Sequence, residues 1–266
     1  MLDISVPARV VAHLGPIPIT DGVLAAFTAS LILVGVALLV RKGLGIVPTR
    51  RQAAVEFLAE YIDEQLAAAF GSRQEGRKHL PIILTLLLFI VIANQLSLFP
   101  FLFQITLEGK PLLRLSTSDL NQTLSLALVV IGSAHLLAFA FSPLRHIGNY
   151  IKIAPLFRAR SGKDLGFALL ELFTGLLDIV GELAKIMSLS ARLFGNIFAG
   201  DVMIAVIASL SAYTRFFVPI PFLVLGIFSG FVQAFVFTLL SIQFLSGTIT
   251  SVKGKDEPSL AQGGAG

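Results

Sequence analysis

Cysteine is absent from the 266 residues of this chain, which excludes disulfides, thiolate metal sites and cysteine nucleophiles. Charged residues are scarce, at 14%, whereas 55% of the residues are hydrophobic and the mean hydropathy is +0.87. A chain this apolar does not dissolve as one water-soluble domain. The composition therefore predicts an integral membrane protein.

Histidine is also sparse, and its few occurrences are isolated. No two of the four histidines have the helical spacing of metal ligands, so we interpret them as surface or packing residues. We expect no metal site and no cofactor. These residues are His13, His79, His135 and His146.

The beginning of the chain lacks the features of a cleaved targeting segment. It has no charged region followed by a short apolar core, and it is not an Arg- and Ser-rich amphipathic presequence. We expect the first apolar run to be retained.

Apolar runs of about 20 residues, the length that crosses a bilayer as a helix, recur along the chain. The fourth is a helical pattern of nearly fifty residues, so it must tilt or bend. The pattern predicts an all-α membrane protein with five transmembrane helices. The expected spans are Gly22–Val40, Leu80–Phe103, Leu124–Phe141, Leu165–Ala212 and Pro219–Leu245.

The segments between the spans have different compositions. Acidic residues at three- and four-residue spacings in Gln52–Phe70 predict an amphipathic helix along the membrane surface. The segment Arg145–Lys163 is basic. Pro143 lies just before it and Pro155 within it, which predicts an aqueous loop. We expect an outward-facing N-terminal segment (1–21), a single polytopic membrane domain (22–250) and a flexible, Gly-rich cytoplasmic tail (251–266).

The distribution of Lys and Arg predicts the orientation of the spans. These residues form short clusters between apolar runs rather than one basic face, so they do not indicate a nucleic-acid partner. Fourteen lie on one side of the five expected spans and four on the other. By the positive-inside rule, the N-terminus lies outside and the C-terminus is cytoplasmic.

One permanent cation, Arg192, lies far inside the long helical run. A charge at mid-bilayer costs about 3 kcal/mol on insertion scales, so an intramembrane ion indicates a functional site. Arginine does not lose its proton at ordinary pH and needs an anionic partner. Three polar residues, Lys185, Ser188 and Asn196, fall within about 40° of Arg192 at 100° per residue, and Asp178 lies close by on the same side.

Acidic residues precede and follow this cation along the same helix. Asp178 and Glu182 are on its cytoplasmic side, and Asp201 is on its outer side. Because Asp178 and Asp201 are about 35 Å apart at 1.5 Å per residue, they indicate two offset aqueous half-paths separated by a positive barrier. The alternative is that these charges only form internal ion pairs, for instance Glu182 with Lys185.

The stretch SLSARLFGNIFAGD, Ser188 to Asp201, resembles the segment of F-type ATP synthase subunit a that carries its essential arginine. A second family stretch is QAFVFTLLSIQFLS, Gln233 to Ser246. Weaker ones are SDLNQTLSLAL, VPTRRQAAVE and NQLSLFP, and together they cover most of the chain in the family order.

The resemblance implies that Arg192 faces the carboxylate of each ring subunit in turn. It also implies that the last two membrane helices form a long tilted hairpin against the rotor ring. Arg192, Asn196 and Gln233 carry over directly, Asp201 stands where many bacterial members have glutamate, and Asp178 matches a position that is acidic in some. Two departures are Gly226, where some bacterial members have histidine, and Phe244, where tyrosine is common.

The function that the resemblance implies is proton translocation by a stator subunit of the membrane sector of a rotary ATP synthase. Such a subunit provides two half-channels that load and unload the ring carboxylates, and it is not an enzyme on its own. The implied partners are the c-subunit ring, the peripheral-stalk b subunits, the rest of the complex and the lipid of a bacterial inner membrane.

Three alternatives remain open at this point. A sodium-translocating version of the same subunit differs mainly in ring ligands that lie outside this chain. A secondary transporter predicts an internal hydropathy repeat, and no convincing one is present. A purely structural anchor for the peripheral stalk leaves Arg192 unexplained.

Overall fold

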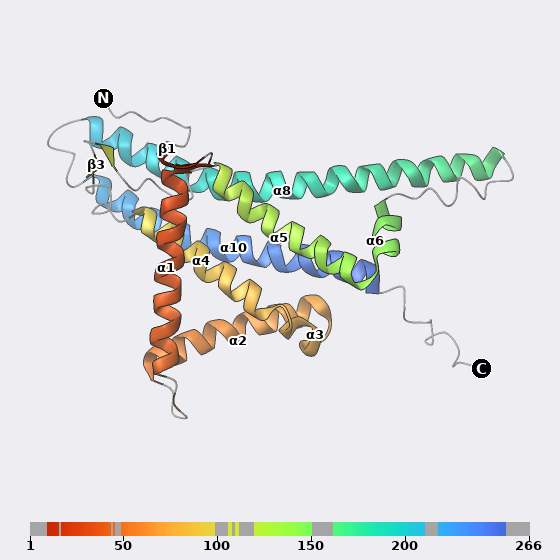
Figure 1. Ribbon diagram of the computed structural model, residues 1–266, viewed down its shortest axis with the longest axis horizontal. Coiled ribbons are helices and arrows are strands. Elements are labelled where there is room, and N and C mark those ends of the chain that lie inside the picture. The colour runs from red at the N-terminus through yellow and green to blue at the C-terminus, as the bar shows by residue number, and fades with distance from the viewer. Residues whose placement is uncertain are drawn as a thin grey trace. The chain divides into compact units, whose positions relative to one another are not determined.

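The computed structural model describes most of the chain, and its described residues form eight helices and four short strands (Figure 1). The described ranges are 10–15, 17–43, 45, 49–98, 106–107, 110–111, 120–150, 162–210 and 218–253. The helices are α1 (Asp21–Lys42), α2 (Arg50–Phe70), α3 (Arg73–Arg77), α4 (Leu80–Leu98), α5 (Leu120–Phe141), α6 (Pro143–Tyr150), α8 (Gly162–Leu210) and α10 (Pro219–Lys253).

The four strands are an addition to the predicted all-α fold. β1 (Val10–Leu14) pairs antiparallel with β2 (Ile17–Thr20), which leads directly into α1. Gly15 makes the turn between them at φ 65°, a left-handed conformation that glycine adopts without steric cost. β3 (Thr106–Leu107) and β4 (Lys110–Pro111) form a second, minimal antiparallel pair.

Local capping explains where the first two helices begin. Thr20 precedes α1 and accepts a hydrogen bond from the Val23 amide at 3.4 Å. Thr49 precedes α2 and does the same for the Gln52 amide, also at 3.4 Å. Both threonines satisfy a backbone donor that has no partner within its helix.

Most of the predicted helices are confirmed. The predicted surface helix is α2, and the predicted fifty-residue helix is α8, a single helix of 49 residues (Figure 1). The predicted loop beginning at Arg145 is wrong over its first residues, which belong to α6. Pro143 is the first residue of α6, where its missing N–H needs no partner, so this proline starts a helix instead of breaking one.

The chain divides into two compact units, and helices α5, α8 and α10 contribute to both. The first unit contains residues 1–126 and 189–242, and the second contains residues 127–188 and 243–266. The single membrane domain expected for 22–250 stays a prediction, and the part of the predicted tail beyond Lys253 lies outside the described residues.

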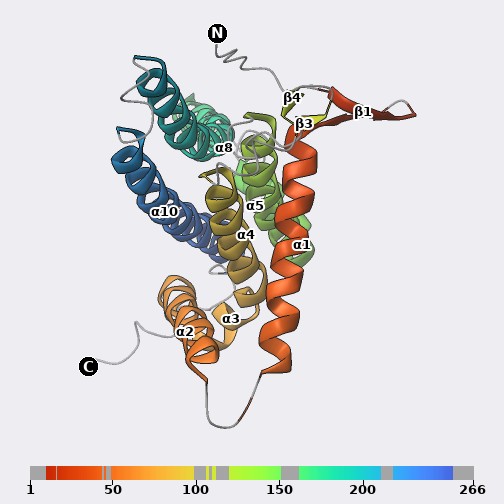
Figure 2. The same cartoon turned by 90° about the vertical axis from the view of Figure 1, so that its left-hand side faces the viewer.

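In the first unit, α4 is the central helix. It packs against α1, and α2 packs against both α3 and α4 (Figure 2). The α4 residues Ile83, Leu87 and Ile90 are fully or almost fully buried at three- and four-residue spacings, so they lie on one face. This face forms much of the core of the unit.

A close turn joins α2 to α3. Gly71 ends α2 in the left-handed region at φ 68°, and α3 then folds back onto α2. A Cβ at Gly76 would lie 2.8 Å from the carbonyl carbon of Leu66, so only glycine fits at this approach. Arg73 donates to the buried carboxylate of Asp63 at 2.7 Å, and this hydrogen bond raises the pKa of Arg73.

Large apolar side chains are exposed along the longest helices. Leu39 of α1 and Leu136 of α5 are both 72% exposed, and Phe167 of α8 is 70% exposed. Among the described residues, α1, α5 and α10 are long and apolar enough to cross a membrane, and α4 is a shorter apolar helix. The chain is therefore a membrane-embedded, predominantly α-helical protein whose exposed apolar surface suits lipid.

The position of α4 decides the span count, and it can be tested by labelling. With 19 residues, α4 is about 28 Å long, close to the thickness of a hydrocarbon core. Lys78 and Leu120 are exposed and lie before α4 and at the start of α5. If α4 crosses the membrane, cysteines introduced as Lys78→Cys and Leu120→Cys will react with a membrane-impermeant maleimide from opposite sides. The cysteine-free parent is the control, and labelling from one side would contradict the five-span topology.

Candidate functional site

Helix α8 carries most of the residues that the sequence singled out. Its residues Leu189, Leu193 and Ile197 are buried, which fixes the face of the helix that packs inward. Arg192 lies off this face and is exposed. No hydrogen bond or ion pair joins its guanidinium to any residue of the described chain. Among the described residues, the Arg192 side chain therefore lies on an exposed face of α8.

One turn beyond Arg192, Asn196 joins α8 to α10. The Ser229 hydroxyl donates to Asn196 Oδ1 at 2.7 Å, and Asn196 Nδ2 donates to the Ser229 carbonyl at 3.4 Å. Two polar groups that lipid cannot solvate thus satisfy each other between helices. This contact joins the C-terminal part of α8 to the N-terminal part of α10.

Helix α4 meets α10 through two amide side chains. Asn94 Nδ2 donates to the Gly230 carbonyl at 2.9 Å, and Gln95 Nε2 donates to the Ile227 carbonyl at 3.1 Å. A Cβ added at Gly230 would lie 3.3 Å from Asn94 Cβ, so a small residue allows this approach. The amide donors of Asn94 and Gln95, which lipid could not solvate, therefore have partners within the protein.

A pocket of about 190 Å³ lies beside these contacts in the first unit. Its polar walls are the side chains of Asn94, Asn196 and Ser229, and Gly226 leaves room on the α10 side. A space of this size is large enough for water molecules, which occupy about 30 Å³ each in the liquid. The polar groups offer hydrogen bonds to such waters near the C-terminal end of α8.

Gln233 lies one turn further along α10 and is buried, with only 8% of its surface exposed. Its Nε2 has no hydrogen-bond partner among the described residues. A buried amide N–H without a partner is destabilising by about 1–3 kcal/mol. Such a group is retained where it serves another purpose, such as binding water or a partner chain.

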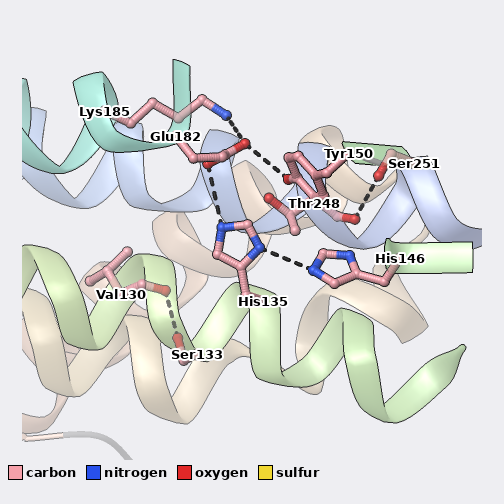
Figure 3. Close-up of polar contacts among 9 residues, drawn as sticks. All are labelled: Val130, Ser133, His135, His146, Tyr150, Glu182, Lys185, Thr248 and Ser251. Atoms are coloured by element: carbon pink, nitrogen blue, oxygen red, sulfur yellow. Dashed lines mark hydrogen bonds and ion pairs between the residues drawn. The ribbon is translucent and has the colours of Figure 1, made fainter. Parts of the chain in front are cut away.

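A second group of polar residues lies in the second unit and centres on Glu182 of α8 (Figure 3). Glu182 Oε1 accepts hydrogen bonds from Lys185 Nζ at 2.7 Å and from the Tyr150 hydroxyl at 3.2 Å. Glu182 Oε2 lies 3.5 Å from His135 Nε2. The predicted ion pair of Glu182 with Lys185 is confirmed, but it is part of a larger network.

The network continues from His135 of α5 to His146 of α6. His135 Nδ1 lies 3.1 Å from His146 Nε2, and their ring centroids are 5.2 Å apart. The interpretation of these residues as isolated histidines is wrong, because α6 turns back from the end of α5. Pro143 between them was the available signal for this turn. His79, which stacks on Phe70 at 4.8 Å, is a packing residue as predicted, and the His13 side chain lies outside the described residues.

Burial changes the proton affinities of the α6 residues. It lowers the pKa of His146, and the neighbouring His135 lowers it further, while Glu182 acts in the opposite direction. Burial also raises the pKa of the Tyr150 hydroxyl, with the nearby Glu182 carboxylate adding to the effect. His146 is therefore a neutral ring at neutral pH, and Tyr150 remains a hydrogen-bond donor.

The other predicted site residues are spread along α8. Asp178 and Ser188 are both exposed, on the described part of the helix. Asp201 belongs to α8, but its side chain lies outside the described residues. Of the predicted residues, Asn196 contacts Ser229 of α10, and Glu182 contacts His135. Asp178 and Ser188 are on the surface. Among the described residues, no group of three or more His, Asp or Glu is arranged to hold a metal ion.

Comparison with known proteins gives a consistent result. The ATP synthase A chain family matches residues 23–246 of the chain. The chain is 28% identical to ATP synthase subunit a of Syntrophobacter fumaroxidans, over 82% of this chain and 80% of that protein.

Two further relatives cover more of both sequences. Identity is 30% with ATP synthase subunit a 2 of a Bradyrhizobium species, over 90% of this chain and 93% of that protein. Identity is also 30% with ATP synthase subunit a of Moorella thermoacetica, over 89% of this chain and 94% of that protein. With a family match across most of its length, an apolar helical fold and Arg192 exposed on α8, the chain belongs to the ATP synthase A chain family.

Proposed function

We propose that this chain is the proton-translocating stator subunit of the membrane sector of a rotary F-type ATP synthase, with Arg192 as its electrostatic barrier. The exposed Arg192 guanidinium, which has no counter-ion on the described chain, carries the proposal. A permanent charge on an apolar helix needs an anion, and a carboxylate on a second membrane protein supplies it. In a rotary ATP synthase that protein is the c-subunit ring.

The mechanism follows from the two states of a carboxyl group. A protonated ring carboxyl is neutral and enters lipid, whereas its anion must remain beside a cation. Arg192 favours the anion and so promotes proton release, and its fixed charge repels protons that would cross directly between the half-paths. Proton flow is therefore coupled to rotation, and the chain itself makes and breaks no covalent bonds apart from those to protons.

The polar residues on either side of Arg192 fit the two half-paths. On the outer side, the pocket beside Asn196 gives water a place near the predicted path residue Asp201. On the cytoplasmic side, the predicted path residues are Asp178, Glu182 and Ser188. Gln233 is buried on α10 with a free amide donor, and it suits the role of orienting a group near Arg192.

The proposed arrangement in the membrane has five spans, with α4 and α8 crossing in addition to α1, α5 and α10. Helices α8 and α10 form the tilted hairpin against the ring, and α2 lies along the cytoplasmic surface. The N-terminus faces outward in a bacterial inner membrane. The peripheral-stalk b subunits and the remaining subunits of the complex are the other proposed partners.

Replacing Arg192 distinguishes between two roles for this residue: an electrostatic barrier to protons and a structural ion pair. In the Arg192→Ala variant we expect the complex to assemble, while ATP synthesis and ATP-driven pumping both fall below detection. Passive proton flow through the membrane sector should persist or rise, because no fixed charge separates the half-paths. Both activities are to be measured on one vesicle preparation, with sodium flow measured in parallel to identify the ion.

Two outcomes of this experiment would contradict the proposal. Retained synthesis in Arg192→Ala would exclude an essential barrier, and loss of assembly with unchanged leakage would indicate a structural role. Arg192→Lys is the matched variant that keeps the charge. It should restore little synthesis, because a buried ammonium can lose its proton and lacks the planar fork of donors.

The two carboxylates that flank Arg192 should act on opposite sides. Asp201→Asn should slow proton entry from outside, and Asp178→Asn should slow exchange with the cytoplasm, each by about tenfold or more for a proton-transfer residue. The measurement is the proton flow in vesicles with a pH step imposed on one side at a time. Asp164→Asn, on the first turn of the same helix, is the control. Normal coupled transport in both variants would show that these carboxylates are structural.

A further inference from the structure

Two histidine rings connect to Glu182 one after the other: His146 contacts His135, and His135 contacts Glu182. His146 lies on α6, His135 on α5 and Glu182 on α8, and each contacts the next (Figure 3). The nitrogen atoms that join them are on opposite sides of the His135 ring. His135 therefore uses Nδ1 toward His146 and Nε2 toward the carboxylate.

The two carboxylate oxygens of Glu182 have different surroundings. Oε1 is occupied by Lys185 and Tyr150, at 2.7 and 3.2 Å. Oε2 faces His135 at 3.5 Å, within the reach of an ion pair. One oxygen thus holds the carboxylate in place, and the other is available to exchange a proton with the ring.

The opposite end of the series is His146 Nδ1. This atom is shielded from solvent and has no hydrogen-bond partner among the described residues. A pocket of about 330 Å³ is bounded by both histidines, Tyr150 and Glu182. At about 30 Å³ per water molecule this space has room for several waters beside the polar atoms of the cluster, although leucine and isoleucine form most of the rest of its lining.

The charges around the rings come from three helices. Glu182, Lys185 and the more distant Asp178 belong to α8, while Tyr150 accompanies His146 on α6 and His135 is the titratable group of α5. On the described part of α10, the residues beside the cluster are Thr248 and Ser251, which carry no charge (Figure 3). Lys253 of α10 lies over the Phe141 ring at 4.4 Å instead. The Lys185 ammonium balances the Glu182 carboxylate, so one added proton gives the cluster a net positive charge.

We propose that His146 and His135 form a two-ring proton relay that exchanges protons between cytoplasmic water and Glu182. The proposal rests on the proposed function, because it assigns the cytoplasmic entrance of the same proton path. It differs from a structural hydrogen-bond network because it requires the rings to gain and lose protons during transport.

Each step of the relay moves one proton and needs no other reactant. In the inward direction a proton from water forms an N–H bond at His146 Nδ1, and the His146 Nε2–H bond breaks as its proton moves to His135 Nδ1. His135 is then an imidazolium beside the Glu182 anion, and its Nε2 proton passes to Oε2. The reverse order delivers protons to the cytoplasm, and rotation of the rings restores their starting tautomers.

Histidine suits this position better than a carboxylate does. Its unperturbed pKa of about 6.5 lies close to cytoplasmic pH, so a ring both accepts and releases protons there. Burial lowers the pKa of His146, so its protonated form is less favoured than that of a free histidine. Glu182 favours a positive charge on His146, and it lies within ion-pair distance of His135, at 3.5 Å.

The test compares a variant that keeps the hydrogen bond with one that removes it. In His146→Gln the amide can replace Nε2 as a hydrogen-bonding group but cannot titrate, and His146→Ala loses both properties. Passive proton flow through the assembled membrane sector is measured in inverted vesicles while the outer, cytoplasmic-side pH is varied from about 5.5 to 8.5 around the histidine pKa. The amount of assembled complex normalises each rate.

The relay predicts that both variants lose flow several-fold and lose the inflection that the unaltered protein shows near the histidine pKa. His79→Gln, at a buried histidine outside the cluster, should keep the unaltered profile. If His146→Gln matches the unaltered protein and only His146→Ala is defective, the ring is structural and the relay is wrong. If the variants fail to assemble, the test uses the unaltered protein alone. A rate of passive proton flow that does not change with cytoplasmic-side pH would then also overturn the relay.

The same vesicles distinguish failure of the relay from failure of the proposed function. If the unaltered sector conducts no protons, the proposed function fails. If it conducts protons and Arg192→Ala abolishes synthesis, while His146→Gln behaves normally, only the relay fails.

Discussion

The constraint on which the structure depends is a permanent positive charge, Arg192, carried by an apolar helix. A guanidinium in a bilayer is unstable without an anion, and the described chain does not supply one. The fold therefore presents Arg192 on an exposed face while Leu189, Leu193 and Ile197 anchor the same helix in the first unit. The proposed stator function needs this combination, because a rigid helix must hold the charge where a moving partner can meet it.

The helices around this charge are joined by polar contacts as well as apolar packing. Lipid is as apolar as leucine, so the hydrophobic effect does little to bring two membrane helices together. Hydrogen bonds from Asn94 to the Gly230 carbonyl and between Ser229 and Asn196 supply specific attachment. Thr123 and Ser190 provide another, with their hydroxyl oxygens 3.1 Å apart. These contacts also leave polar groups beside a pocket, so the residues that join the helices are the ones that can bind water.

In the second unit, polar residues from α5, α6 and α8 form one network around the Glu182 carboxylate instead of separate pairs. Glu182 could have been satisfied by Lys185 alone, since the two are three residues apart on one helix. Instead, α5 and α6 bring His135, His146 and Tyr150 to the same carboxylate. A network of titratable groups in a partly enclosed pocket has a capacity for proton exchange that a single ion pair lacks.

The sequence by itself determined most of the helices, the membrane environment and the family, and it singled out Arg192 as the candidate functional residue. Those properties depend on local periodicity, apolar length and a stretch of consecutive residues, all of which can be read along one chain. The sequence also identified the pairing of Glu182 with Lys185, because helical spacing fixes it. Only the tertiary structure decided that His135 and His146 meet, that Asn196 reaches Ser229, and that Gln233 is buried with a free donor. These facts depend on how α6 turns back after Pro143 and how α10 approaches α8, and helical periodicity contains no information about contacts between separate helices.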